Sequence, residues 1–183
     1  MGPSRIQRNR AALLVVDIQE RLLPAISGQE RVVRNSRRLI QGAGVLRVPI
    51  FATEQYRKGL GATVPEIAAS LGTVLPLEKL TFSAFGVEAL VQALAAAKVS
   101  DVLLCGIETH VCIAQTALDF LDARFRVFVA ADAVSSRQPE DHRIGLERIR
   151  GAGGVIVSTE MILFDLLERA GTDEFKRILA LVK

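Results

Sequence analysis

Cys112 is the residue of this 183-residue chain whose type and position are best suited to chemistry. It lies in LCGIETHVCIAQ (104–115), where Gly106 ends an apolar run typical of a strand and Thr109 is a suitable N-cap for a helix. Cys112 then falls in the first helical turn, where amide N–H groups and the helix dipole favour a thiolate, lower its pKa and hold an oxyanion. These features predict a nucleophile. The alternative is a small apolar residue packed on the buried face of the helix.

Three other residues, one Cys and two His, are weaker candidates for a catalytic role than Cys112. Cys105 lies inside the apolar run VLLCGI and is predicted to be a core residue. His110 suggests a Cys–His pair, but residues two apart on a helix do not face each other. We therefore expect His110 to lie at the surface or behind the site, and His142, in mid-helix among Arg and Glu, to be structural.

Asp17 and Lys79 are the charged residues best suited to assist such a nucleophile. Asp17 closes the apolar run AALLVV (11–16), and ligands of open parallel sheets bind outside the carboxyl ends of the strands. A turn or a helix cap is the alternative role for Asp17. Lys79 lies between two leucines in LEKLTFSAF. It is either a fixed positive charge near the strand ends or a lysine that keeps an exposed edge strand from pairing with another chain.

The elements that must position these residues alternate between short apolar strands and helices. We predict strands at 11–16, 48–54, 101–107, 126–132 and 154–159, and helices at 33–46, 87–98, 110–123, 139–153, 159–171 and 172–182. Thr159 is the expected N-cap of its helix. Such alternation is typical of βαβ units and a parallel sheet. Segment 55–76 lacks a clear period, and we expect a long loop that forms a wall of the active site or a subunit contact.

Composition excludes several classes of protein. The net charge is +3, and Lys and Arg are scattered without interleaved aromatic residues, so we expect no nucleic-acid partner. No apolar run approaches the ~18 residues of a membrane span, and the basic segment MGPSRIQRNR leads into too short an apolar run for a signal peptide. The two cysteines form neither a disulfide framework nor a zinc pattern. We expect a single cytoplasmic domain over residues 1–183, without a membrane partner.

The candidate residues lie in motifs that resemble those of the isochorismatase-like cysteine hydrolase superfamily, which includes nicotinamidases and N-carbamoylsarcosine amidohydrolases. The matching segments are LLVVDIQERLL with Asp17, EKLTFSAF with Lys79, CGIETHVCIAQTALDFL with Cys112, and ADAVSSRQPEDHRIGLERIRGAGGVIVSTEMILFDLL. They extend over about residues 11–169. The resemblance implies an α/β fold, a doubly wound three-layer sandwich with a six-stranded, mainly parallel sheet. Its sixth strand would be the short segment around Leu77 to Lys79.

The resemblance also implies roles for these residues. Asp17, Lys79 and Cys112 would form a catalytic triad, in which Lys79 holds Asp17 ionised and Asp17 takes the thiol proton. The Cys112 thiolate would attack the substrate and form a covalent thioester, which water then hydrolyses. A non-proline cis peptide at Ile107–Glu108 and an oxyanion hole of turn N–H groups near Glu108 and Cys112 are further expectations.

Two differences from members of this superfamily narrow the expected activity. Nicotinamidases carry an Asp-x-His metal pattern after the second strand, whereas this chain has TEQYRKG there, without His. Isochorismatases that cleave a vinyl ether do not use the cysteine that this chain has. We therefore expect an amidohydrolase with no metal or other cofactor, acting on the C–N bond of a small amide, ureide or carbamoyl-type substrate.

Gln19, Tyr56 and Phe82 are expected to contact this small-molecule substrate. The resemblance implies a homo-oligomer, as dimer or tetramer, and the high apolar fraction fits that expectation. Two other functions stay open at this point. One is a catalytically silent interaction protein on the same fold, and the other is an isochorismatase-type vinyl-ether hydrolase or an esterase.

Overall fold

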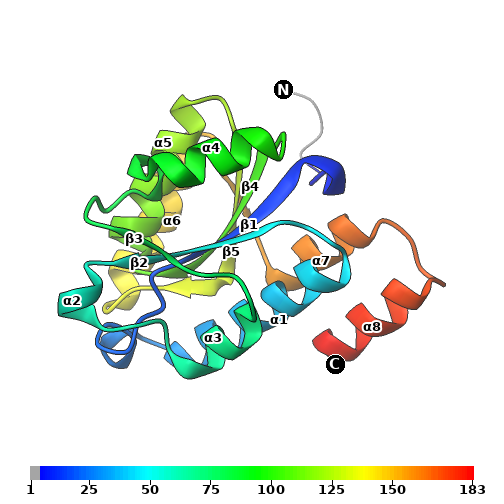
Figure 1. The fold of residues 1–183 in the computed structure, drawn as a ribbon, viewed down its shortest axis with the longest axis horizontal. Coiled ribbons are helices and arrows are strands. Elements are labelled where there is room, and N and C mark those ends of the chain that lie inside the picture. Colours follow the sequence, from blue (N-terminus) through cyan, green and yellow to red (C-terminus); the bar gives the residue numbers. More distant parts are fainter. Residues whose placement is uncertain (1–4) are drawn as a thin grey trace.

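The fold is built on a six-stranded sheet in the order β3-β2-β1-β4-β5-β6, in which every pair of neighbouring strands is parallel (Figure 1). A computed structural model describes residues 5–183, so the first four residues of the basic N-terminal segment lie outside the described residues. The strands are β1 (Ala11–Val16), β2 (Ile50–Gln55), β3 (Leu77–Lys79), β4 (Asp101–Ile107), β5 (Arg126–Ser135) and β6 (Val155–Val157). The predicted α/β class with six strands is confirmed.

The two central strands, β1 and β4, are buried along their whole length because helices cover both faces of the sheet. Side chains of a strand alternate between the faces. Leu13 and Val15 accordingly belong to one hydrophobic core, and Leu14 and Val16 belong to the other. Continuous apolar runs therefore predicted both strands with correct bounds.

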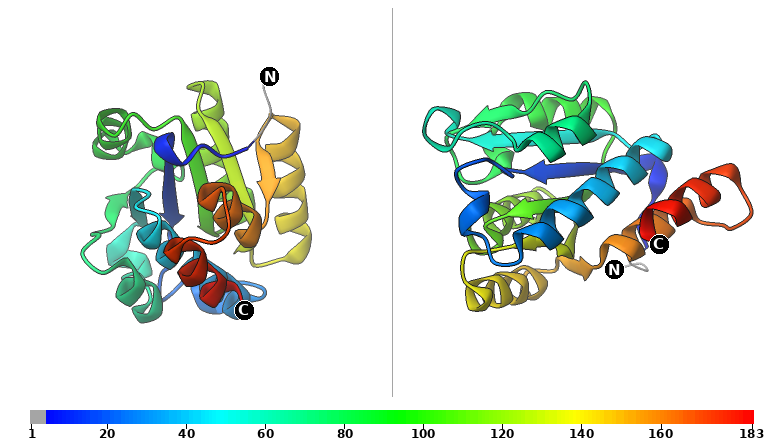
Figure 2. Two further views of the ribbon diagram at one scale, coloured as in Figure 1. Left: turned by 90° about the vertical axis from the view of Figure 1, so that its right-hand side faces the viewer. Right: turned by 90° about the horizontal axis from the view of Figure 1, so that it is seen from below.

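Helices form a layer on each side of the sheet, as the two further views show (Figure 2). One layer contains α1 (Gln29–Val45), α3 (Pro65–Leu71), α7 (Thr159–Leu167) and α8 (Asp173–Val182). The other contains α4 (Glu88–Ala96), α5 (Ala114–Asp122) and α6 (Pro139–Gly151). The short helix α2 (Arg57–Leu60) follows β2, and 3-10 turns lie at Arg8–Arg10, Leu23–Ala25 and Ala84–Gly86. The three-layer arrangement is the one expected.

Segment 55–76 is not the long loop that was predicted, because it folds into α2 and α3. Pro65 occupies the first position of α3, where its missing N–H is not needed. Ile67 and Leu71 are buried against the core under α1. A helix this short shows too few apolar repeats to be recognised in the sequence.

Two predicted helix caps are also wrong. Ser158, rather than Thr159, caps α7, because its hydroxyl accepts a hydrogen bond from the Met161 amide. Thr159 lies in the first turn and donates to Asp132 Oδ1. Thr109 is no cap either, because the helix predicted over 110–123 begins as a π-helical turn, Thr109–Ile113, that continues into α5.

The strand order reverses between β1 and β4, because the chain adds β2 and β3 on one side of β1 and then β4, β5 and β6 on the other. Ligands of open α/β sheets bind in the crevice outside the carboxyl ends of the strands at such a point. Asp17 and Cys112 follow these two strands, and Lys79 ends β3. Within residues 5–183, no helix has the length and apolar character needed to cross a membrane.

Candidate active site

Asp17 and Lys79 form a buried ion pair at the carboxyl edge of the sheet. Asp17 follows β1 with a left-handed backbone (φ 55°), which turns the chain sharply out of the strand. Its Oδ2 lies 2.7 Å from Lys79 Nζ, and neither side chain is exposed to solvent. Its Oδ1 accepts a hydrogen bond of 2.8 Å from Thr53 Oγ1, on the neighbouring strand β2. Asp17 is thus held by contacts to other strands and not by capping a helix.

Lys79 Nζ has three hydrogen-bond acceptors besides its ion pair with Asp17. Lys79 Nζ donates to Gln55 Oε1 at 2.7 Å, to the Phe82 carbonyl at 2.9 Å and to the Thr81 carbonyl at 3.3 Å. Asp17 Oδ2 lies 2.7 Å from the ammonium nitrogen, so the charge of Lys79 compensates that of Asp17. A carboxylate oxygen in such an ion pair still has a lone pair that can take a proton.

Cys112 lies in the π-helical turn that follows β4 and is only 4% exposed. The turn starts at Glu108, which adopts a left-handed conformation with φ 59° and ψ 62°. The peptide bond between Ile107 and Glu108 is trans, so the expected cis peptide is wrong. The left-handed Glu108 provides the change of direction between strand and turn instead.

Burial raises the pKa of the Cys112 thiol to about 12. The negative charge of Asp17 and a hydrogen bond to it add to the rise, as does the charge of Glu108, while the charge of Lys79 opposes it. The expectation that the helix start lowers this pKa is therefore wrong, because desolvation and two carboxylates outweigh the turn. Cys112 is a neutral thiol near neutral pH, and it needs a base before it can act as a nucleophile.

Cys112 opens onto a cavity of about 330 Å³. The wall is mostly apolar, with a few polar groups, as is usual for a small-molecule site. The lining residues are Arg21, Leu22, Ala25, Gln55, Leu60, Phe82, Glu108, Val111, Cys112 and Arg137. Leu60 belongs to segment 55–76, so part of that segment does form a wall of the cavity.

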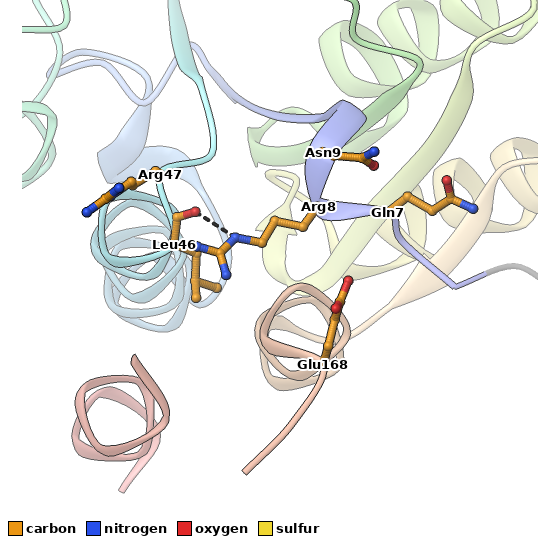
Figure 3. A pocket seen from close by; sticks show the side chains of 6 residues that line it. All are labelled: Gln7, Arg8, Asn9, Leu46, Arg47 and Glu168. Carbon is orange, nitrogen blue, oxygen red and sulfur yellow. Dashed lines mark hydrogen bonds between the residues drawn. The ribbon is translucent and has the colours of Figure 1, made fainter. Parts of the chain in front are cut away.

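A larger groove of about 500 Å³ lies at the opposite, amino-terminal edge of the sheet (Figure 3). It is lined by Gln7, Arg8, Asn9, Leu46, Arg47 and Glu168. Arg8 is already bound, since its Nε donates to the Leu46 carbonyl at 2.8 Å and its guanidinium pairs with Glu174. The groove is open and contains no nucleophile, so the smaller cavity with Cys112 is the candidate active site.

The three expected substrate contacts lie in different places. Phe82 lines the cavity. The Gln19 side chain is buried and bound to backbone, since its amide donates to the carbonyls of Gln55 and Gly61 and accepts from the Gln55 amide. Tyr56 is 49% exposed and is absent from the described lining of the cavity.

Sequence reasoning missed the four polar or charged side chains of the cavity: Arg21, Gln55, Glu108 and Arg137. Gln55 had a usable signal, because it ends β2, directly beside β1. For Glu108, only a backbone role in the oxyanion hole was predicted. Nothing in the local sequence marks Arg21 or Arg137, since their positions depend on how the turns after β1 and β5 pack.

The remaining Cys and His side chains lie outside the cavity. Cys105 is completely buried, as predicted, and burial raises its pKa to about 12. His110 Nδ1 forms a hydrogen bond of 3.0 Å with Ser136 Oγ. His142 Nδ1 bonds Thr109 Oγ1 at 2.9 Å, and burial and the charge of Arg31 lower its pKa. Among residues 5–183, no cluster of three or more His, Cys, Asp or Glu side chains is placed to hold a metal ion.

Comparisons with known proteins bear on the fold and the family of this chain. Residues 11–161 match the family model described as the Isochorismatase domain. The chain is 38% identical over 177 residues to isochorismatase domain-containing protein 2 of Danio rerio, covering 97% of this chain and 89% of that protein. It is 41% identical over 168 residues to isochorismatase domain-containing protein 1 of the same organism, covering 91% of this chain and 59% of that longer protein. A solved structure named MAR1 ribonuclease, from Caenorhabditis elegans, has a TM-score of 0.93 at 35% identity and covers 98% of this chain and 92% of its own.

Proposed function

The chain belongs to the isochorismatase-like family of hydrolases, and on that premise we propose that it hydrolyses the C–N bond of a small amide, ureide or carbamoyl compound with Cys112 as nucleophile. One observation supports the proposal most strongly. Cys112, the only cysteine among the described lining residues of the cavity, is next to a buried carboxylate, Asp17, whose charge is balanced by Lys79.

The first step is transfer of the thiol proton from Cys112 to Asp17. The raised pKa of the thiol makes this transfer unfavourable at rest, so the thiolate forms only as it attacks the carbonyl carbon. The ammonium group of Lys79, held by three hydrogen bonds, compensates the charge of Asp17 before the transfer. The N–H groups of the turn near Glu108 and Cys112 stabilise the oxyanion that develops.

The second half of the reaction reverses the direction of proton transfer. Asp17 gives its proton to the departing amine or ammonia, and a thioester or thiocarbamate remains on Cys112. Asp17 then activates a water molecule, which hydrolyses this intermediate and restores the thiol. These steps use only a sulfur nucleophile and proton transfers, and they involve no metal or other cofactor.

Self-association into a homo-oligomer is part of the proposal. Large apolar side chains are exposed around the edge strand β3, namely Tyr56, Leu75, Leu80 and Phe82. Exposed apolar groups beside a strand edge are typical of surfaces that pair with another chain. Both cysteines are buried and free, which suits a reducing compartment such as the cytoplasm.

The test is hydrolysis of a panel of small amides, ureides and carbamoyl compounds by the wild-type protein and by Cys112→Ala. Cys105→Ala serves as the matched control, because it removes a thiol that does not line the cavity. We expect release of ammonia or amine by the wild type and by Cys105→Ala, and at least a 1000-fold loss (an order-of-magnitude expectation for a covalent nucleophile) in Cys112→Ala.

Esters, a vinyl ether and an RNA oligonucleotide complete the panel, the last because one similar structure is named a ribonuclease. Activity on any of these that survives Cys112→Ala contradicts the proposal. Failure of the wild type on every compound favours a non-catalytic protein on the same fold.

A further inference from the structure

The mechanism above makes no use of Glu54, a buried acid close to the candidate active site. Glu54 directly precedes Gln55, the last residue of β2, whose side chain lines the cavity. The Glu54 side chain is only 3% exposed. A carboxylate is rarely buried to this degree unless it is paired. The partners of this carboxylate therefore indicate its role.

Both carboxylate oxygens of Glu54 are directed at the segment that follows β2. Oε1 accepts hydrogen bonds from the amide and the hydroxyl of Thr63, at 2.6 and 2.7 Å. Such short distances are typical of hydrogen bonds to a charged acceptor. Oε2 lies 3.4 Å from Arg57 Nε, but the Arg57 side chain is 59% exposed, so this ion pair contributes little. Glu54 is thus attached mainly to Thr63.

The segment 56–63 has little internal structure to hold it in place. Its helix α2 has only four residues, far too few to be stable alone. Tyr56 and Gly61, which flank α2, have positive φ angles of 38° and 81°. This conformation is unfavourable for Tyr56, because a side chain crowds the left-handed backbone. The position of the segment therefore depends on its contacts with the rest of the fold.

The contacts of this segment with the turn after β1 form part of the cavity. Thr63 pairs with Gln19 in an antiparallel bridge. The Arg21 amide donates to the Leu60 carbonyl at 3.1 Å. The side chains of Arg21 and Leu60 both line the cavity. The hydrogen bonds from Thr63 to Glu54 therefore fix one end of the pairing that places Leu60 in the cavity wall.

We propose that Glu54 is a positioning residue, whose carboxylate holds the segment 56–63 against the turn after β1 and so keeps Leu60 in place as an apolar wall for the substituent of the substrate. The inference rests on the proposed function, because it concerns the compound that Cys112 attacks. Glu54 itself is not among the described lining residues of the cavity. A long apolar substituent depends on this wall, whereas a single methyl group has almost no chain to lie against it.

The first test compares the hydrolysis of hexanamide and acetamide by the wild type and by Glu54→Ala. Loss of a contact that is equally strong in the ground state and the transition state raises KM and leaves kcat unchanged. We expect KM for hexanamide to rise about 10-fold or more, the size of a lost apolar contact in a pocket, while kcat/KM for acetamide stays within about twofold. Thr63→Val lacks the hydroxyl donor and should show a smaller rise, and Thr63→Ser should behave as the wild type.

Hydrogen exchange measured by mass spectrometry tests the contact itself, without turnover. The amides of residues 56–64 should exchange about 10- to 100-fold faster in Glu54→Ala, the range for loss of a hydrogen bond to a charged group. Unchanged exchange in α1 shows that the fold is intact. Glu66→Ala removes an exposed acid at the start of α3 and is the matched control, which should change neither the exchange nor KM.

If Glu54→Ala does not fold, Thr63→Val replaces it and must raise KM for hexanamide selectively. An equal loss on both amides, or exchange of residues 56–64 at the wild-type rate, overturns the inference. A wild type that hydrolyses neither amide contradicts the proposed function instead. Hexanamide binding to the Cys112→Ala protein then decides the role of Glu54, because Cys112→Ala/Glu54→Ala should bind it about 10-fold more weakly and equal binding overturns the inference.

Discussion

The two cysteines differ in their neighbours, although burial raises the pKa of both thiols to about 12. Cys105 lies beside Ser36 and is surrounded by core residues. Cys112 has Asp17 beside it and a cavity in front of it. A neutral thiol is a poor nucleophile until a base takes its proton. We therefore expect Cys112 to react when a substrate is bound beside it and to resist unspecific oxidation otherwise.

Replacement of Asp17 by Asn should therefore separate thiol ionisation from turnover. The Asp17 charge raises the pKa of Cys112, so its removal lowers that pKa from about 12 and moves the alkaline rise in iodoacetamide labelling to lower pH. Hydrolysis should nevertheless be lost, because the proton acceptor is gone. Labelling is measured by mass spectrometry across a pH series, with Cys105 in the same protein as the slow internal control. An unchanged or higher midpoint for Cys112 would contradict this assignment.

The element that decides the position of Cys112 is the π-helical turn between β4 and α5. Helix α6 packs closely on this turn at Gly145. A Cβ atom added there would lie 3.0 Å from the Cα and N atoms of His110. The turn is therefore held from one side by the end of β4 and from the other by the backbone of α6.

Gly145→Ala should thus reduce activity by displacing the turn. We expect a loss of about 10- to 100-fold in kcat/KM, since small misplacements of a catalytic group cost this much. Gly151→Ala, in the same helix, is the matched control, because a Cβ there meets no atom within 4 Å. It should leave activity unchanged and stabilise the protein by about 0.4–1 kcal/mol. Equal activities of the two variants would show that the contact with α6 does not position Cys112.

On the scale of the whole molecule, the two hydrophobic cores differ in their distance from the candidate active site. The core under α4, α5 and α6 includes Cys112. The other core extends to α8, where Ile178 is fully buried beside α1 and α7. The C-terminal helix covers α1 and has no residue in the cavity, so it contributes to stability at a distance from the chemistry.

Ile178→Ala should accordingly destabilise the protein while kcat/KM stays within about twofold. Loss of a fully buried isoleucine costs about 2–5 kcal/mol, and the neighbouring half-buried Leu181→Ala should cost less. Urea denaturation gives the free energy of unfolding, and activity is measured well below the unfolding midpoint. A large loss of activity in folded Ile178→Ala would show that the two cores are coupled.

Local patterns in the sequence determined the elements whose signals are strong. Continuous apolar runs predicted β1 and β4 with correct bounds, and the charged and nucleophilic residues at strand ends indicated Asp17, Lys79 and Cys112. A rule about parallel sheets then placed Asp17 at the ligand-binding edge, whereas the grouping of Asp17, Lys79 and Cys112 came from the family resemblance. These inferences depend only on the type of each residue and on its position along the chain.

Only the tertiary structure decided the environment of these residues. The pKa of Cys112 is raised and not lowered because burial and two carboxylates, contributed by separate turns, outweigh the helix start that the local sequence suggests. The trans peptide before Glu108 and the π-helical turn likewise depend on packing between distant segments. Desolvation and long-range contacts depend on the whole fold, so no local pattern in the sequence contains them.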